Sequence, residues 1–331
     1  MDTDQHDGHS PGPLEIQPAV GPASPLWVSP RRPPRFQHRY ARHVVLFLLT
    51  FATTSMAGAC HQLSFEASMG SIALPVEWQW SYVLGGMSYS VPLLLILGAH
   101  EFGHYVYCRI HQVDATLPYF LPFPVPLTGT LGAVIRIREA FPSKRALFDI
   151  GVAGPIAGFV VLLPFLWWGM TLSGVVRFPD STELIYFGEP LLLKAIAGLH
   201  FGPLPEGFDI VLHPMGFAAW FGMLATALNL LPFGQLDGGH IAYSIFGART
   251  TWVSAATLAI AILLFATQSS SWFGVALMML VMALVLGLRH PRIIDEDTRL
   301  DAGRVAVAIL SLVIFVICFT PVPIEMFLSN P

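Results

Sequence analysis

A pair of histidines four residues apart, with a glutamate beside the first, could bind and use a metal ion. The run His100-Glu101-Phe102-Gly103-His104 lies in an apolar stretch that we expect to be helical. Positions i and i+4 share one face of a helix, so both imidazoles can reach one Zn²⁺. A glutamate next to the first ligand can face a water at such a metal and take its proton. The motif therefore predicts a hydrolytic zinc site with Glu101 as general base.

This motif specifies only three positions, and it also occurs in chains where it has no function. Its surroundings favour a functional reading here. It lies near the end of an apolar stretch long enough to cross a membrane. Two imidazoles and a carboxylate are costly in hydrocarbon unless they have a compensating role. The position of the motif therefore favours a metal site over a purely structural one.

A third ligand is needed, because catalytic zinc usually takes three protein ligands. Asp237 is the candidate. It lies in the run NLLPFGQLDGG, residues 229–239, which ends a later apolar stretch. Pro232 and the glycines break the helix there and allow the carboxylate to turn inward. Asp237 could instead cap the following helix. Cys108 and His240 are less favoured alternatives for the metal.

Composition places most of the chain in a bilayer. Of its 331 residues 54% are hydrophobic and only 11% are charged, whereas soluble domains have about 25% charged residues. We therefore predict an all-α polytopic membrane protein. Seven apolar stretches are long enough to be transmembrane helices: 43–59, 84–108, 147–172, 214–232, 250–268, 272–288 and 304–320. The three cysteines are too far apart to indicate a disulfide framework.

Basic residues predict the orientation of these helices. With the N-terminus in the cytoplasm, 15 of the 17 Lys and Arg residues fall on the cytoplasmic side, and only Arg177 and Lys194 fall outside. Both segments with candidate metal ligands then end at the same face. We expect a multi-pass protein of a bacterial plasma membrane with a cytoplasmic N-terminus.

Two domains are expected. Residues 1–41 are rich in Pro, Asp, His and Arg and predict a disordered cytoplasmic tail. Residues 42–331 would form the transmembrane domain, with a catalytic core of about 84–250. Between the second and third spans, four prolines forbid a continuous helix in a segment that is still apolar. We predict a short membrane-associated strand at residues 131–137, to which an extended substrate could pair by strand addition.

The two motifs together resemble the signatures of the site-2 protease family, which comprises intramembrane zinc metalloproteases. The resemblance covers roughly residues 84–250. It implies that His100, His104 and Asp237 hold Zn²⁺ and that Glu101 is the catalytic glutamate. Asn229 matches the asparagine of the second motif, so an oxyanion-stabilising or substrate-contacting role is expected for it. No PDZ or CBS domain is apparent, which indicates a compact member of the family.

The resemblance also implies the reaction and the partners. The expected function is hydrolysis of peptide bonds within or near transmembrane segments, in regulated intramembrane proteolysis. The expected partners are a transmembrane protein substrate and the lipid bilayer, without nucleic acid, and the oligomeric state stays open. A zinc-binding membrane transporter and a catalytically inactive family member are the alternatives. The small residues Gly154 and Gly158 are expected to serve close helix packing rather than chemistry.

Overall fold

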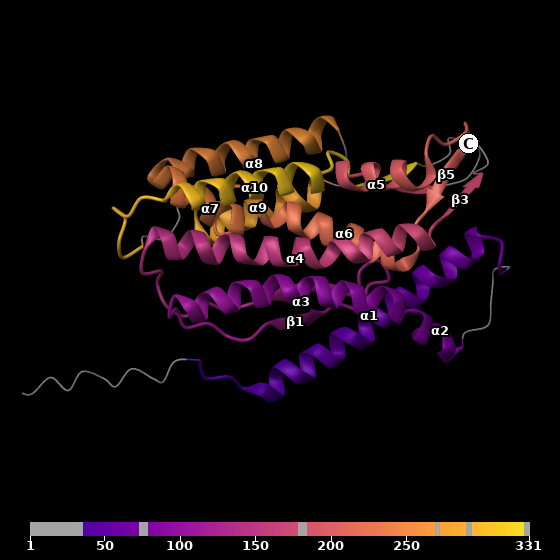
Figure 1. The fold of residues 1–331 in the computed structure, drawn as a ribbon, viewed down its shortest axis with the longest axis horizontal. Coiled ribbons are helices and arrows are strands. Elements are labelled where there is room, and N and C mark those ends of the chain that lie inside the picture. Colours follow the sequence, from indigo (N-terminus) through magenta and orange to yellow (C-terminus); the bar gives the residue numbers. More distant parts are fainter. Residues whose placement is uncertain are drawn as a thin grey trace, which may run out of the picture. The chain divides into compact units, whose positions relative to one another are not determined.

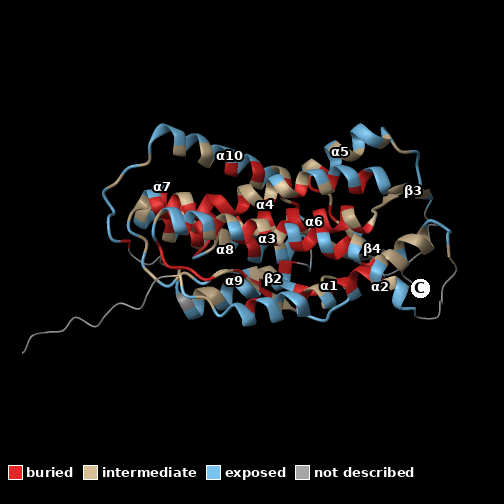
Figure 2. Ribbon diagram, turned by 60° about the horizontal axis from the view of Figure 1, so that its bottom comes forward, coloured by how far each residue is buried: buried red, intermediate tan, exposed pale blue. Residues whose placement is uncertain are grey.

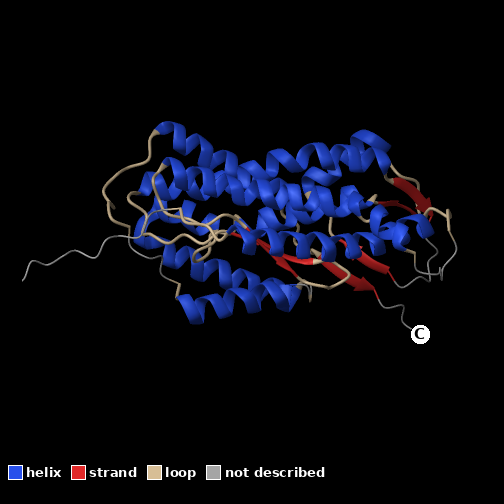
Figure 3. Ribbon diagram, turned by 90° about the horizontal axis from the view of Figure 1, so that it is seen from below, coloured by secondary structure: helices blue, strands red, loops and turns tan. Residues whose placement is uncertain are grey.

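Helices dominate the computed structural model, which describes residues 36–72, 79–177, 184–268, 270, 272–288 and 293–327 (Figure 3). The α-helices in these ranges are α1 (Tyr40–Ser68), α2 (Trp80–Gly85), α3 (Met87–Ile110), α4 (Lys144–Leu172), α5 (Leu191–Phe201), α6 (Pro214–Asn229), α7 (Asp237–Phe246), α8 (Thr250–Thr267), α9 (Trp272–Leu286) and α10 (Ala302–Cys318). Short strands form three antiparallel pairs: β1 (Tyr119–Pro122) with β2 (Thr130–Val134), β3 (Gly174–Arg177) with β5 (Phe208–Val211), and β4 (Leu184–Phe187) with β6 (Ile324–Phe327).

Each predicted span overlaps a helix, and the span 84–108 overlaps both α2 and α3. Four helical segments are long and apolar enough to cross a membrane: Tyr40–Ser68, Trp80–Ile110, Lys144–Leu172 and Asp237–Thr267. The other three predicted spans correspond to α6, α9 and α10, which have 16, 15 and 17 residues. An upright crossing needs about 20 residues. The helical class is therefore confirmed, whereas the count of seven transmembrane helices is not.

The centre of the helical unit is built on α4. Figure 1 shows α3 and α6 running along it, and both helices contact it extensively. Ser143 starts α4 as its N-cap, because its side chain accepts the Ala146 N–H at 3.2 Å. Buried residues are concentrated along α4 and α6 (Figure 2). Large side chains among them include Phe148, Leu162, Trp220 and Met223. The element that carries the core thus also runs beside the histidine motif on α3.

The β1–β2 hairpin occupies the proline-rich connection between α3 and α4. The strand predicted at residues 131–137 is found as β2, Thr130–Val134, and Ile137 adds an isolated antiparallel bridge to Ala115. Gly129 and Gly132 have φ of 71° and 104°, a region that only glycine enters at little cost. These two residues let the chain turn into the strand at the surface of the helices. The predicted short β segment is therefore present, with shifted bounds.

One ion-pair cluster ties α10 to α4. Arg304 Nε and Nη2 lie 2.7 and 2.6 Å from Oδ1 and Oδ2 of Asp149, and His111 Nε2 lies 3.0 Å from the same Oδ2.

Arg304→Ala leaves this mostly buried carboxylate without its bidentate partner. We expect a loss of about 2 kcal/mol in the free energy of unfolding in detergent. Lys194→Ala, which removes an exposed pair to Glu189 at 3.5 Å, should change it by less than about 1 kcal/mol. An equal loss of stability in the two variants would contradict a stabilising role for the Arg304–Asp149 ion pair.

The predicted disordered tail lies largely outside the described residues, which begin at Phe36. Its end is ordered where it is described. Helix α1 begins at Tyr40, two residues earlier than the predicted domain boundary. The backbone N–H of Phe36 donates to Asp114 Oδ1 at 2.6 Å, and the Arg109 guanidinium stacks 4.3 Å from the centre of the Phe36 ring.

Candidate metal centre

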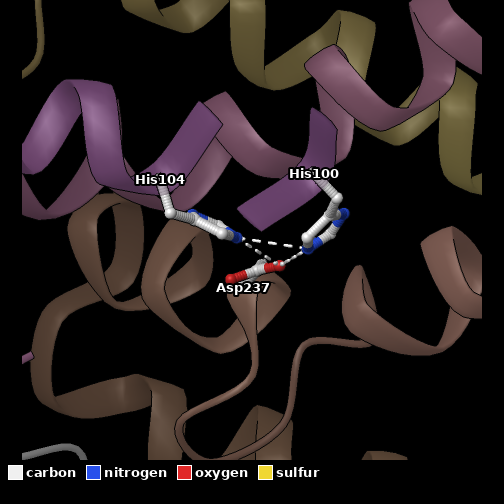
Figure 4. A group of neighbouring side chains, drawn as sticks. All are labelled: His100, His104 and Asp237. Carbon is white, nitrogen blue, oxygen red and sulfur yellow. Dashed lines mark hydrogen bonds and ion pairs between the residues drawn. The ribbon is translucent and has the colours of Figure 1, made fainter. Parts of the chain in front are cut away.

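Three potential ligand atoms converge between α3 and the start of α7 (Figure 4). Asp237 Oδ2 lies 3.2 Å from His100 Nε2 and 3.3 Å from His104 Nε2, and the two Nε2 atoms are 3.2 Å apart. Zinc bonds of 2.0–2.1 Å in tetrahedral geometry require ligand atoms about 3.3 Å apart. The donor set of two imidazoles and one carboxylate, at this spacing, therefore fits a catalytic zinc ion.

Helix α4 orients the second histidine. His104 Nδ1 lies 2.7 Å from the Ile150 carbonyl oxygen. A carbonyl oxygen only accepts hydrogen bonds, so Nδ1 carries the proton. The lone pair of Nε2 is then free to bind a metal ion between the three ligand atoms. Gly154 makes this approach possible, because a Cβ atom there would overlap the imidazole of His104. The glycine predicted to serve packing thus packs against a candidate ligand itself.

A tight turn after α6 positions the carboxylate. The chain leaves α6 at Asn229, turns through Gly234 with a φ of 52°, and enters α7 at Asp237. Gly238 and Gly239 lie against the backbone of this turn, and a Cβ atom at either position would collide with carbonyl oxygens there. The helix is preceded by Leu236 without a side-chain cap. Capping by Asp237, the alternative from the sequence, is therefore not its arrangement.

Glu101 lies beside the three donors without joining them. Its side chain is buried, with 8% of the residue exposed. The backbone N–H of Ile135, directly after β2, lies close to its carboxylate. The hairpin therefore reaches the candidate general base. The sequence alone did not predict this neighbour of Glu101, because the fold of the segment between α3 and α4 brings Ile135 there.

Asn229 also reaches the centre. Its Nδ2 lies 3.4 Å from His100 Nε2, at the C-terminal end of α6. The two alternative ligands lie elsewhere in the described part of the chain. Cys108 is buried in a small cluster with Val113, Ala115 and Ile150, and the His240 ring packs 5.5 Å from that of Phe141. Neither belongs to the group of three converging donors.

Known plant proteins match large parts of this chain. "Probable zinc metalloprotease EGY2, chloroplastic" of Arabidopsis thaliana is 31% identical over 72% of this chain and 42% of its own length. "Probable zinc metalloprotease EGY1, chloroplastic" of the same species is 26% identical over 86% of this chain and 53% of its own length. The rice protein of the same name is 28% identical over 63% of this chain and 38% of its own length. The chain thus spans about half or less of the length of these relatives. No solved structure matches it.

These relatives overturn one prediction. A bacterial plasma membrane with a cytoplasmic N-terminus was expected, but the relatives are named as chloroplastic proteins. The distribution of basic residues orients helices relative to one another and to a membrane, but it does not identify the membrane.

A family model gives the broader assignment. Peptidase family M50 matches residues 88–268, which is more than half of the 331 residues and includes both motifs. The matched residues hold the three converging donors and Glu101. The relatives are named zinc metalloproteases, in agreement with a donor set that fits zinc. The chain therefore belongs to peptidase family M50, the site-2 protease family of zinc metalloproteases.

Proposed function

We propose that this chain hydrolyses peptide bonds within or near transmembrane segments of other membrane proteins. His100, His104 and Asp237 hold the zinc ion, and Glu101 is the general base. One observation carries the proposal: the three donors come from two of the helical segments long and apolar enough to cross a membrane. A substrate that meets such a centre must itself enter the membrane region. Regulated intramembrane proteolysis, with a transmembrane protein as substrate, is the proposed setting.

The chain's own groups account for the proton transfers. Zinc, when bound, lowers the pKa of a coordinated water towards ~7 and polarises a carbonyl group. Glu101 takes a proton from the attacking water as its oxygen bonds to the scissile carbonyl carbon. When the C–N bond breaks, Glu101 delivers that proton to the leaving amine. The Ile135 N–H close to its carboxylate is proposed to orient it for both steps.

Asn229 is proposed to contact the reacting carbonyl group. Its amide Nδ2 faces the same space as the donor atom of His100. An amide N–H placed there can donate to the negative charge that develops on the carbonyl oxygen.

The domain organisation is also part of the proposal. Residues 42–331 form a transmembrane protease domain, and its shorter helices α6, α9 and α10 also cross the membrane.

Strand β2 is proposed to hold the unwound substrate. The N–H of Ile135 lies close to the Glu101 carboxylate, and we propose that this edge of the segment faces the catalytic centre. Backbone groups alternate between the two edges of a strand, which places the N–H of Ala133 on the same edge. An extended substrate that pairs there would present its backbone beside the base.

Ala133→Pro removes the N–H at this edge. We expect cleavage of a transmembrane substrate to fall at least about tenfold, because strand pairing loses a backbone hydrogen bond and gains a steric block. The zinc content should not change. Ala133→Val, which retains the N–H, is the matched control and should cleave nearly as well as the wild type. Normal cleavage by the proline variant would exclude substrate pairing at this edge.

Asp237→Asn tests the centre as a whole. The purified wild-type chain in detergent should carry about one zinc ion per chain and cleave a tagged single-span membrane protein. The asparagine variant should lose most of its zinc and its cleavage, because a charged ligand becomes a neutral amide. Zinc bound by the wild type without cleavage of any substrate in a panel with helix-breaking residues would indicate an inactive family member. Full zinc in the variant would remove Asp237 from the ligand set.

A further inference from the structure

The β1–β2 hairpin needs support from outside itself. Its strands have four and five residues, and an isolated two-stranded hairpin is marginally stable at best. Gly132 lies inside β2 with a φ of 104°, and a glycine within a strand weakens it further. The bridge between Ala115 and Ile137 closes the base of the hairpin. Its tip, residues 123–129, lies at the other end of the strands, so other elements must hold it.

Helix α1 runs beside the hairpin from its base to its tip, with extensive contacts to β1. His43 Nδ1 lies 3.0 Å from the Pro118 carbonyl oxygen, just before β1. Further along, the ring of Phe47 packs edge-on against Phe120 of β1, with ring centroids 5.2 Å apart. At the tip, a Cβ atom at Gly129 would collide with the backbone of α1. The tip therefore lies directly on this helix.

Three consecutive carbonyl groups at the tip, those of residues 127–129, each meet a side-chain donor. His61 Nε2 on α1 lies 2.9 Å from the first, and it carries the proton because a carbonyl oxygen only accepts. The hydroxyl of Tyr89 on α3 donates to the second at 3.2 Å. Thr53 Oγ1 on α1 donates to the third at 2.7 Å, the shortest of its three carbonyl contacts. Beside a candidate membrane span, hydrocarbon would offer these carbonyl groups no partner.

We propose that α1 positions β2 for substrate pairing, with Thr53, His61 and Tyr89 as positioning residues. The role rests on the proposed function, in which an extended substrate pairs with β2. A strand that is already held in place does not have to be ordered when the substrate binds, and that ordering would weaken binding. None of the three residues belongs to the group of metal donors, so their loss should affect KM rather than zinc content. Helix α1 precedes residues 88–268, so the family match assigns it no role.

The test compares Thr53→Val with Thr53→Ser and Thr50→Val. Valine has nearly the shape of threonine but cannot donate a hydrogen bond, whereas serine can. Thr50 is a buried residue one turn earlier on α1, and its hydroxyl donates within the helix, to the Leu46 carbonyl at 2.8 Å. Initial rates of the full chains in detergent, over a range of concentrations of the tagged single-span substrate, give KM and kcat.

Thr53→Val should raise KM about fivefold, the worth of one hydrogen bond, with kcat within about twofold of the wild type. Its zinc content should not change. Thr53→Ser and Thr50→Val should both keep the wild-type KM. Tyr89→Phe removes a second donor at the tip, so the double variant with Thr53→Val should raise KM about tenfold or more.

A second readout does not depend on proteolysis. Hydrogen exchange of the backbone amides of residues 128–134, followed by mass spectrometry, should be faster in Thr53→Val and in the double variant than in the wild type. Exchange in Thr50→Val should match the wild type. Unchanged exchange in Thr53→Val would show that its hydroxyl does not hold the hairpin, and would overturn the proposal.

The kinetic outcomes separate this role from the proposed function. A wild-type KM in Thr53→Val, or an equal rise in Thr50→Val, would overturn the positioning role of α1. A fall in kcat or in zinc content with KM unchanged would do the same, because it indicates a general disturbance of the fold. If Ala133→Pro loses cleavage while Thr53→Val keeps the wild-type KM, substrate pairing at β2 stands and only the role of α1 fails. A wild type that cleaves no substrate would overturn the proposed function itself.

Discussion

Glu101→Gln should retain zinc and lose proteolysis. Glutamine has nearly the same size as glutamate, so the buried site keeps its packing. It cannot take a proton from water. Loss of a general base typically costs about 10²- to 10⁴-fold in rate. Zinc should stay near the wild-type level, because Glu101 is outside the group of three donors.

The measurement pairs zinc quantification with cleavage of a tagged single-span substrate by the same detergent preparation. Glu206→Gln provides the control, because it neutralises an exposed carboxylate that lies outside the metal centre. This variant should cleave at the wild-type rate. Cleavage by Glu101→Gln within a few-fold of wild type would exclude Glu101 as the base. Loss of zinc from that variant would instead make it a ligand or a support of one.

Gly154→Ala should disrupt the centre, although it replaces neither a proposed ligand nor the proposed base. The added methyl group would overlap the imidazole of His104, and that ring cannot move away without breaking its hydrogen bond to the Ile150 carbonyl. Losing such an orienting partner typically costs 10- to 100-fold in metal affinity. We therefore expect zinc affinity to fall by about that factor, with an added loss of about 1–3 kcal/mol in stability from overpacking.

Competition with a chelator of known affinity measures this change. Gly198→Ala on α5 is the control, because nothing lies within 4 Å of a Cβ atom there; alanine should be neutral or slightly stabilising at that helical position. If Gly154→Ala binds zinc as the wild type does, α4 does not hold the His104 ring against the other donors. Activity restored by excess zinc would show that the variant damages metal binding and not the chemical step.

The sequence alone determined the helical class and the chemistry of the centre. The apolar stretches predicted helices correctly because a bilayer leaves the backbone few alternatives. The spacing of His100 and His104 places both on one helix face by local geometry alone. The donor types of these residues and of Asp237 predicted zinc, which agrees with the family and with the names of its relatives. These features depend on neighbours a few residues apart.

The tertiary structure decided everything that joins distant segments. It brings Asp237 to the histidines across more than 130 residues of chain, lays Gly154 and Ile150 against His104, and carries Ile135 to Glu101. It also gives α6, α9 and α10 lengths short of an upright crossing, so that the seven predicted crossings are not confirmed. Helix packing sets these contacts through the fit of whole surfaces. No local pattern contains that fit, so composition and spacing identified the candidate site residues without showing what holds them in place.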